Sequence, residues 1–408
     1  MVMTSGTLGR GVYVVDAVRT PIARYAGGLS SVRPDDLSAH VIAALVKRNE
    51  ALAAHLDHVV FGATNQAGED NRNVARMALL LAGLPYEVPA VTVNRLCGSG
   101  LEALADASRL IAAGEAECVI AGGVESMTRA PFSMPKAASG FDRTPPHVYD
   151  TTLGWRYPNP KMEARFPLIS MGETAENVAE KYGISREDQD RFALSSHQKA
   201  VLAWNQGVFA AEIVPVPVPQ KKGEPLLFER DECLRPDATL EALAKLSPVF
   251  RKGGSVTAGN SSPINDGASA LLLASAQLVE KAGLRPLARV IGSQAVGVHP
   301  SFMGEGPIPA VKKLCSRLGV RPSDIDLVEL NEAFAAQSLA CVRALELDPA
   351  VVNVNGGAIA LGHPIGSSGA RIACTLLHAM RAQGKRLGLA SLCVGVGQGI
   401  ATMFEGVA

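Results

Sequence analysis

Cys97 lies in a segment whose residue types favour a reactive thiol. Residues 93–100, VNRLCGSG, are typical of a strand end, a tight glycine turn and a helix start. A thiol near a helix N-terminus lies close to free N–H groups and the positive end of the helix dipole, which favour the thiolate. An unperturbed cysteine is only a few per cent ionised at pH 7, so a nucleophile needs such activation. The alternative is an inert buried cysteine.

The same segment also matches a short dinucleotide-binding pattern. Gly98 and Gly100, followed by Ala103, resemble the glycine turn after a first strand, and Glu125 follows the next predicted strand, where an acid can bind a ribose. Glycine patterns this short are common, and Cys97 has no part in the motif. A nicotinamide-dependent dehydrogenase stays open as an alternative.

His363 lies in residues 356–369, GGAIALGHPIGSSG, where glycines and a proline surround a single imidazole. Histidine beside cysteine makes a nucleophile with its activator. This loop is the counterpart of the Cys97 loop in a sequence repeat, and a pseudo-twofold axis would bring the two loops together. A structural histidine is the alternative.

Two further segments end predicted strands with groups that can act on a carbonyl compound. Cys393 lies in residues 389–399, LASLCVGVGQG, whose glycines let backbone N–H groups approach a reacting oxygen. Asn331 opens residues 331–334, NEAF, and its amide can hold a water or a substrate oxygen. A core cysteine and a simple helix cap are the alternatives.

The elements that must position these residues alternate between strands and helices. Short β-branched runs at 12–18, 59–61, 91–93 and 118–121, with an amphipathic helix at 36–48, predict an α/β protein with a mostly parallel sheet. Seven of the 25 prolines fall between Pro131 and Pro167, so this stretch is expected to be mainly loop. Helices are expected near 173–182, ending at Gly183, and after Ser185, with Asp188 completing a capping box.

A repeat divides the chain. Residues 57–61 match 326–330, and 98–100 match 367–369, both at an offset of 269 (326 − 57 and 369 − 100). The constant offset predicts a duplicated unit, unless any two strand–helix–strand units would look alike. The expected boundaries are an N-terminal half at 1–126, continued at about 265–284, an inserted domain at 127–264 and a C-terminal half at 285–408.

Composition excludes several classes of protein. The 39 Lys and Arg balance the 39 Asp and Glu, so no basic field exists to attract nucleic acid. Seven cysteines without a C-x-x-C pair argue against a disulfide framework or a metal site and favour the reducing cytoplasm. Residues 1–10 lack the apolar core of a signal peptide, and no apolar run reaches the roughly 18 residues of a membrane span. We expect a soluble, cytoplasmic protein.

Taken together and in this order, the two glycine-framed cysteines, the GHPIGSSG histidine and the NEAF turn resemble the thiolase family. The resemblance is near full length and includes 122–127 (GGVESM), 174–177 (TAEN), 184–186 (ISR) and 256–260 (VTAGN). It implies a duplicated α/β unit in a five-layer αβαβα arrangement with an inserted loop domain. It also implies a homo-oligomer, expected to be a homotetramer built as a dimer of dimers, with a homodimer as the alternative.

The resemblance implies a role for each matched residue. Cys97 matches the nucleophile that takes the acyl group as a thioester, and Cys393 matches the acid/base. His363 matches the residue that activates the nucleophile and helps hold the substrate thioester oxygen. Asn331 matches the residue that fixes a water in this first oxyanion hole, and the N–H groups of Cys97 and Gly395 match the second hole.

By the same resemblance, coenzyme A is a substrate bound on the inserted domain, with no resident cofactor and no metal. Ser262 matches a residue bonding the pantetheine arm, and Arg235 matches one near the adenine. The remaining matched positions line the binding path and are Phe250, Met171, Phe334 and Ala258. Ser170 stands where short-chain biosynthetic members carry histidine, so a close copy of their acetoacetyl-CoA site is not expected.

Within the family, 24–28 (RYAGG), 65–76 (NQAGEDNRNVAR) and 150–156 (DTTLGWR) resemble the β-ketoadipyl-CoA thiolases of aromatic-compound breakdown. This implies cleavage of 3-oxoadipyl-CoA by coenzyme A to acetyl-CoA and a shortened acyl-CoA. The alternatives are an acetoacetyl-CoA or general 3-ketoacyl-CoA thiolase, another condensing enzyme such as a ketoacyl synthase, which has histidine in place of Cys393, and a catalytically silent acyl-CoA-binding protein.

A dicarboxylic acyl tail would need a cation or several N–H donors, because burying an unpaired carboxylate is costly. Arg129, Arg156 and Arg165 lie in the proline-rich stretch of the insertion. We favour Arg156, which belongs to the DTTLGWR stretch, with a surface position as the alternative for each.

Overall fold

The computed structural model describes residues 11–407, and segment 1–10, for which no signal peptide is expected, lies outside the described residues. A mixed sheet runs through the molecule in two halves of matching strand order. The first half has the order β4-β3-β5-β10-β1, with bounds Ala90–Val93, His58–Gly62, Cys118–Ser126, Asn265–Ser275 and Val12–Arg19, and β2 (Ala23–Arg24) pairs with β10. The second has the order β12-β13-β14-β11, with bounds Leu327–Leu330, Leu387–Val394, Gln398–Gly406 and Ala288–Gly297.

The two halves repeat one another in detail. A single parallel bridge between Val328 and Val352 lies beside β12 in the place that β4 has beside β3. Asp57 Oδ2 accepts the N–H groups of the two residues at the start of β5, at 2.7 and 3.1 Å. Asp326 Oδ2 accepts the two equivalent N–H groups at the start of β13, at 3.1 and 2.8 Å. The repeat in the sequence is therefore a repeat in structure.

The prediction of a mostly parallel sheet is wrong. Parallel pairing is confined to β3–β4, β3–β5 and β12–β13, besides isolated bridges, whereas β5–β10, β10–β1, β1–β11, β11–β14 and β14–β13 are antiparallel. In each half, the last strand in chain order (β10 or β14) runs antiparallel to the long strand before it (β5 or β13). β14 follows β13 through the short turn at 395–397, while β10 follows β5 only after the whole insertion. A tight turn suffices for an antiparallel neighbour, whereas a parallel one needs a crossover.

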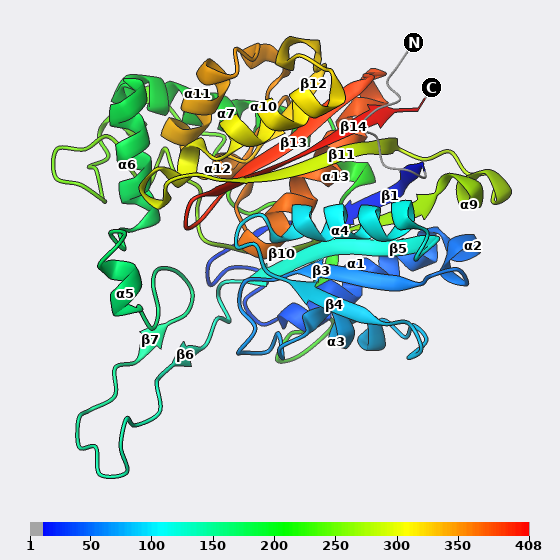
Figure 1. Ribbon diagram of the computed structural model, residues 1–408, viewed down its shortest axis with the longest axis horizontal. Helices are drawn as coiled ribbons and strands as arrows, with labels where there is room; N and C mark the ends of the chain where they lie inside the picture. Colours follow the sequence, from blue (N-terminus) through cyan, green and yellow to red (C-terminus); the bar gives the residue numbers. More distant parts are fainter. Residues whose placement is uncertain (1–10, 408) are drawn as a thin grey trace.

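Helices form three layers around the sheet halves (Figure 1). α4 (Ser99–Ala113) and α13 (Ile365–Gln383) lie in the middle and share one apolar core with strands of both halves. α1 (Pro34–Arg48) and α3 (Val74–Leu81) cover the outer face of the first half, and α10 (Pro307–Leu318) and α11 (Ala335–Ala344) cover that of the second. This confirms the five-layer αβαβα arrangement.

The insertion contains short elements around two longer helices, and the chain near β6 and β7 projects from the body (Figure 1). Its elements are β6 (Phe132–Ser133), β7 (Tyr149–Asp150), α5 (Pro160–Glu163), α6 (Met171–Tyr182), α7 (Arg186–Asn205), η1 (Val208–Ala211), β8 (Val216–Val218), β9 (Leu226–Phe228) and α8 (Leu240–Ala244). The remaining short helices of the chain are α2 (Glu50–Ala53), α9 (Ala276–Lys281), η2 (Pro300–Glu305), η3 (Pro322–Asp324), η4 (Pro349–Val351) and α12 (Ala358–Leu361). Among residues 11–407, no helix has the length and apolar character of a membrane span.

Helix starts in the insertion differ in one respect from expectation. Ser185 Oγ accepts the N–H of Asp188 at the start of α7, as predicted. The capping box is not completed, and the Asp188 carboxylate binds Arg343 and Arg191 at 2.8 and 2.6 Å. The complete capping box lies instead at α6, between Ser170 and Glu173.

The N-terminal ends of α4 and α13 approach each other without intervening side chains. A Cβ on Gly100 would lie 2.6 Å from the Ala370 nitrogen, and a Cβ on Gly369 would clash with the Leu101 nitrogen. Gly100 and Gly369 are repeat partners, as are Leu101 and Ala370, so the two contacts are equivalent. The glycines therefore set how close the two helix starts can lie.

We expect Gly369→Ala to lower the free energy of unfolding by about 1–3 kcal/mol, because the backbone of α4 cannot yield to the new methyl group. Helix propensity alone would favour alanine by about 1 kcal/mol, so a loss can only come from the clash. The midpoint of thermal unfolding, measured by circular dichroism, should fall. Gly140→Ala, where the methyl group would meet open space, is the control. An unchanged midpoint for Gly369→Ala would show that the helices separate at little cost.

Candidate active site

The four side chains expected to carry chemistry lie at the ends of elements that meet. Cys97 directly precedes Gly98, the N-cap of α4, and His363 lies two residues before α13. Asn331 follows the last residue of β12, and Cys393 is the next-to-last residue of β13, which pairs in parallel with β12. The carboxyl ends of two parallel strands thus lie beside two helix N-termini.

The two cysteine loops are in contact. A Cβ on Gly98 would lie 2.9 Å from Cγ2 of Val394, so the residues that follow Cys97 and Cys393 pack on each other. Cys393 is buried and Cys97 is partly buried. The sulfur atoms are close enough for the charge of Cys97 to act on Cys393.

Burial dominates the electrostatics of both thiols. It raises the pKa of Cys97 to about 11, although the N–H groups of Gly395 and of Cys97 itself lower it. Burial and the neighbouring Cys97 raise the pKa of Cys393 well above its ordinary value. The N–H groups that favour the thiolate thus come from Cys97 itself and from the Gly395 loop rather than from α4, and the effect of burial on the pKa exceeds theirs.

The hydrogen bonds of His363 define its tautomer. Ser368 Oγ donates to the Pro364 carbonyl at 2.8 Å, so it must accept from His363 Nδ1–H at 2.6 Å. Nε2 is then unprotonated and faces Asn331 Nδ2 at 3.4 Å. Burial, with a smaller effect of Arg371, lowers the pKa of His363 to about 3. The imidazole is neutral, with its free lone pair on Nε2.

Asn331 has one polar atom without a partner. Its N–H donates to the Ser391 carbonyl at 3.0 Å and its Nδ2 faces His363, but its buried Oδ1 accepts no hydrogen bond from any described residue. Leaving a buried amide oxygen unpaired costs about 1–3 kcal/mol. The atom is therefore suited to a water or ligand donor.

Two residues that hold His363 were missed by the sequence analysis. Ser368 lies in the same motif, one helical turn into α13, and could have been found by its spacing. Asn265, the first residue of β10, accepts the His363 N–H at 2.8 Å through Oδ1 and donates from Nδ2 to Ala23 O at 2.9 Å and Cys233 Sγ at 3.2 Å. It has no local signal, because it is nearly a hundred residues from the histidine.

Glu125 does not fit the dinucleotide alternative. Its buried carboxylate accepts N–H groups from Thr64, Asn65 and Gly366 at 3.1, 3.3 and 2.9 Å, and the Thr64 hydroxyl at 2.8 Å. Burial raises its pKa. The acid is thus engaged in tying the start of α13 to the first half, and the glycine turn packs against α13 rather than facing a cofactor. The dehydrogenase interpretation is wrong.

The residues expected to contact coenzyme A fall into two groups. Met171, Phe250 and Phe334 pack with Cys393 in one cluster, in which the two phenylalanine rings lie edge to face with centroids 6.1 Å apart. The Ser262 N–H donates to Ala333 O at 3.0 Å, which places it beside this cluster.

Arg235 and Ala258 are exposed. Arg235 lies near His197 of α7, whose pKa is lowered to about 4 by burial and by this charge. Their contact with coenzyme A stays a prediction.

The three arginines of the proline-rich stretch differ in their partners. Arg129 is bound by Glu69 at 2.5 and 2.6 Å, so its charge is already paired. Arg156 is exposed and donates from Nη1 to Thr151 O at 3.0 Å, while Thr151 Oγ1 accepts from Asn65 Nδ2 at 2.8 Å. The Asn65 N–H in turn donates to Glu125, which also accepts the Gly366 N–H at the start of α13. A chain of hydrogen bonds thus links Arg156 to the start of α13. A role for Arg156 stays a prediction.

In the described part of the chain, no group of three or more His, Cys, Asp or Glu side chains could hold a metal.

Known proteins share this architecture over the whole chain. A β-ketoadipyl-CoA thiolase of Pseudomonas putida is 58% identical over 401 residues, which cover 98% of this chain and all of the relative. A 3-oxoadipyl-CoA/3-oxo-5,6-dehydrosuberyl-CoA thiolase of Escherichia coli K12 is 54% identical, with the same coverage. The crystal structure of human mitochondrial 3-ketoacyl-CoA thiolase in complex with CoA superposes with a TM-score of 0.92 at 41% identity, covering 99% of this chain and all of that one.

Family models assign both halves. The model described as Thiolase, N-terminal domain, matches residues 12–277, and that described as Thiolase, C-terminal domain, matches residues 284–406. With two catalytic-type cysteines, a histidine and an asparagine meeting between the duplicated halves, the chain belongs to the thiolase family.

Proposed function

We propose that the protein is a 3-oxoadipyl-CoA thiolase, cleaving its substrate with coenzyme A to acetyl-CoA and succinyl-CoA in the breakdown of aromatic compounds. The observation that carries the chemistry is the meeting of Cys97, Cys393, His363 and Asn331 at one site. The dicarboxylic substrate is supported by the β-ketoadipyl-CoA thiolases, more than half identical over the whole chain. We further propose a cytoplasmic homotetramer, with a homodimer as the alternative, that uses coenzyme A as a substrate and no resident cofactor.

In the first half-reaction, Cys97 Sγ attacks the 3-oxo carbonyl carbon while His363 Nε2 takes the thiol proton. The N–H groups of Cys97 and Gly395 stabilise the oxyanion of the addition product. The bond between carbons 2 and 3 then breaks, leaving a succinyl thioester on Cys97 and the acetyl-CoA enolate. Cys393 donates its proton to carbon 2 of the enolate.

The tautomer of His363 suits both of its tasks. Its free lone pair on Nε2 accepts the proton of Cys97, and the resulting N–H can donate to the enolate oxygen. Asn331 Oδ1, which lacks a partner in the described residues, holds the water that supplies a second donor. Each well-placed oxyanion donor contributes about 2.7–4 kcal/mol in comparable sites.

In the second half-reaction, the thiol of coenzyme A attacks the succinyl thioester and gives its proton to the Cys393 thiolate. Cys97 leaves and recovers its proton from His363. Protons and charges balance over the two halves, and neither cysteine ends in a changed state. Thiol exchange avoids trapping the acyl group, because a thioester stays reactive toward the next thiol.

Cys393→Ser should still be acylated on Cys97 but should lose turnover by at least about 10²-fold, because a serine hydroxyl is far too weak an acid to replace the thiol. Incubation with acetyl-CoA, followed by peptide mass spectrometry, locates the acyl group, and a thiolysis assay gives turnover. Cys315→Ser, in α10 and remote from the site, is the control. An acetyl group on Cys393 with Cys97 free in the wild type, or normal turnover in Cys393→Ser, would contradict the assignment.

Alkylation of Cys97 by iodoacetamide should accelerate with pH. Since burial raises its pKa to about 11, the thiolate is a small minority at pH 7 and grows about tenfold per pH unit below that value. The rate of alkylation at Cys97 between pH 7 and 10, followed by peptide mass spectrometry so that the other thiols do not interfere, should follow this slope. A plateau near neutral pH would instead indicate a preformed thiolate–imidazolium pair with His363.

The wild-type substrate range tests the proposed function, by thiolysis of acetoacetyl-, 3-oxohexanoyl- and 3-oxoadipyl-CoA. We expect the last to be preferred. No thiolysis of any of them would remove the function, and no preference for the dicarboxylic tail would remove the substrate.

Arg156→Met tests tail recognition. It should lower kcat/KM for 3-oxoadipyl-CoA roughly 30-fold, which corresponds to about 2 kcal/mol of lost transition-state stabilisation. This is the lower end of the range for breaking a charge pair, because the arginine is exposed to solvent. The value for 3-oxohexanoyl-CoA should barely change, since that tail has no charge. Arg165→Met, an exposed arginine whose guanidinium carbon lies 5.9 Å from the centroid of Phe166, is the matched control. Equal losses on both substrates would exclude Arg156 from the tail pocket.

A further inference from the structure

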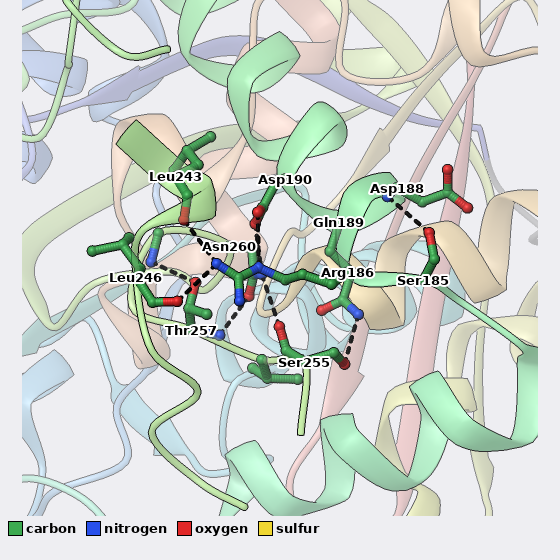
Figure 2. A network of polar contacts seen from close by, with 12 residues as sticks. Ser185, Arg186, Asp188, Gln189, Asp190, Leu243, Leu246, Ser255, Thr257 and Asn260 are labelled. Carbon is green, nitrogen blue, oxygen red and sulfur yellow. Dashed lines mark hydrogen bonds and ion pairs between the residues drawn. The ribbon is translucent and has the colours of Figure 1, made fainter. Parts of the chain in front are cut away.

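The segment 255–262, which carries Ala258 and Ser262, is held by a buried polar network with Asn260 at its centre (Figure 2). Asn260 Oδ1 accepts the Thr257 N–H at 2.8 Å. Its Nδ2 donates to Asp190 Oδ1 at 3.0 Å and to the Ser255 carbonyl at 3.2 Å. Every polar atom of this amide is thus used to shape the segment or to fasten it to α7.

Asp190 is itself fixed. It is buried, and its Oδ2 accepts Arg186 Nε at 2.7 Å. Arg186 Nη2 then donates to the carbonyls of Leu243 and Leu246, at 2.7 and 2.9 Å, at the end of α8 (Figure 2). A buried carboxylate is costly unless it is paired, and here one guanidinium both pairs it and sets its direction.

On its other side, the segment is joined to the turn that follows Asn331. The Ala335 N–H, at the start of α11, donates to Asn260 O at 2.9 Å, and Ser262 N–H donates to Ala333 O at 3.0 Å. The first N–H groups of a helix have no partner within it, so Asn260 supplies one that α11 lacks. Asn260 therefore binds Asp190 with its side chain and the Asn331 turn with its main chain.

We propose that Asp190 is a positioning residue which, through Asn260, places the coenzyme A segment and the Asn331 turn relative to each other. This rests on the proposed function, from which the roles of Ser262 and Asn331 come. The pantetheine arm of coenzyme A and the first oxyanion hole must be positioned correctly relative to each other, because the arm brings the thioester oxygen to the hole. The buried contact between Asp190 and Asn260 can adjust both, because Asn260 is bonded to both.

Asp190→Asn tests the proposal. The new amide has one acceptor oxygen, so either Arg186 Nε or Asn260 Nδ2 would face an N–H group. We expect KM for coenzyme A to rise and kcat to fall, with a combined loss of about tenfold or more in kcat/KM, in keeping with one charge-assisted hydrogen bond. Sites are titrated as Cys97 acylated at saturating acetyl-CoA and quantified by peptide mass spectrometry, and rates are measured per titrated site, which leaves out any misfolded protein.

Asp188→Asn is the matched control on the same helix. Asp188 is partly exposed and binds Arg343 and Arg191 at the surface, with no contact to Asn260. Its kinetic constants per titrated site should equal those of the wild type. A purely structural role for Asp190 would lower thermal stability in Asp190→Asn while leaving KM and kcat per titrated site unchanged, and that result would overturn the proposal.

The reciprocal double variant gives a second, independent test. Asn260→Asp alone places two carboxylates against each other and should be worse than Asp190→Asn. Combined with Asp190→Asn, it exchanges donor and acceptor across the contact, and the introduced carboxylate still accepts the Thr257 N–H, whereas the Ser255 carbonyl loses its Nδ2 donor. KM for coenzyme A should therefore recover in part, and a double variant no better than Asn260→Asp alone would count against the proposal.

If Asp190→Asn does not fold, Asp190→Glu keeps the charge and displaces the carboxylate by one methylene. It should show the same rise in KM, and unchanged constants would overturn the proposal equally. Absence of thiolysis activity in the wild-type protein would instead contradict the proposed function. This result would be obtained before any variant is made, so the two failures can be distinguished.

Discussion

The close approach of α4 and α13 is the constraint on which the site depends. Gly100 and Gly369 leave no room for a side chain between the two helix starts, and repeat symmetry makes the two contacts equivalent. Because Cys97 precedes one helix and His363 the other, the distance between the helices sets the distance between the two loops. The Gly366 N–H donates to Glu125 of β5 and fixes the same approach from the first half of the sheet. The distance between the Cys97 and His363 loops is therefore set by how closely the two helices pack in the core.

Packing two loops into the middle layer brings polar groups into an apolar core, and each must find a partner. Ser368 and Asn265 supply partners for His363, and Glu125 accepts N–H groups that would otherwise be unpaired. Among the described residues, the exceptions include Asn331 Oδ1, which keeps its acceptor for a ligand or water. The same burial keeps both thiols and the imidazole neutral at rest. In the proposed mechanism, charge then develops only during reaction, where fixed N–H donors would stabilise it without reorganisation.

Sequence alone predicted what local patterns determine, which includes the repeat, the strand and helix ranges, and the four side chains at element ends. Predictions from the sequence were wrong where strand direction or a hydrogen-bond partner depends on a segment far away in the chain. The direction of β10 depends on a return through the entire insertion, so alternation of strands and helices wrongly suggested a parallel sheet. Asp188 was expected to complete a capping box with the N-cap Ser185, but the box is not formed, and the Asp188 carboxylate binds Arg343, 155 positions away. Asn265 holds the His363 loop across 98 positions, which no motif spacing reveals.

A buried ion pair beneath the site bears on how the enolate is stabilised. Arg371 of α13 donates to Glu329 of β12 at 3.2 Å, yet its Nε and Nη2 have no partner among the described residues. Burial raises the pKa of Glu329, against the opposing effect of the arginine. The charge of Arg371 adds to burial in lowering the pKa of His363. A field that opposes a proton on the imidazole also favours negative charge beside it, where the proposed enolate oxygen would lie. The histidine is a weak base at rest mainly because it is buried, and in the proposed mechanism the proton that it takes from Cys97 becomes the Nε2–H that donates to the enolate oxygen.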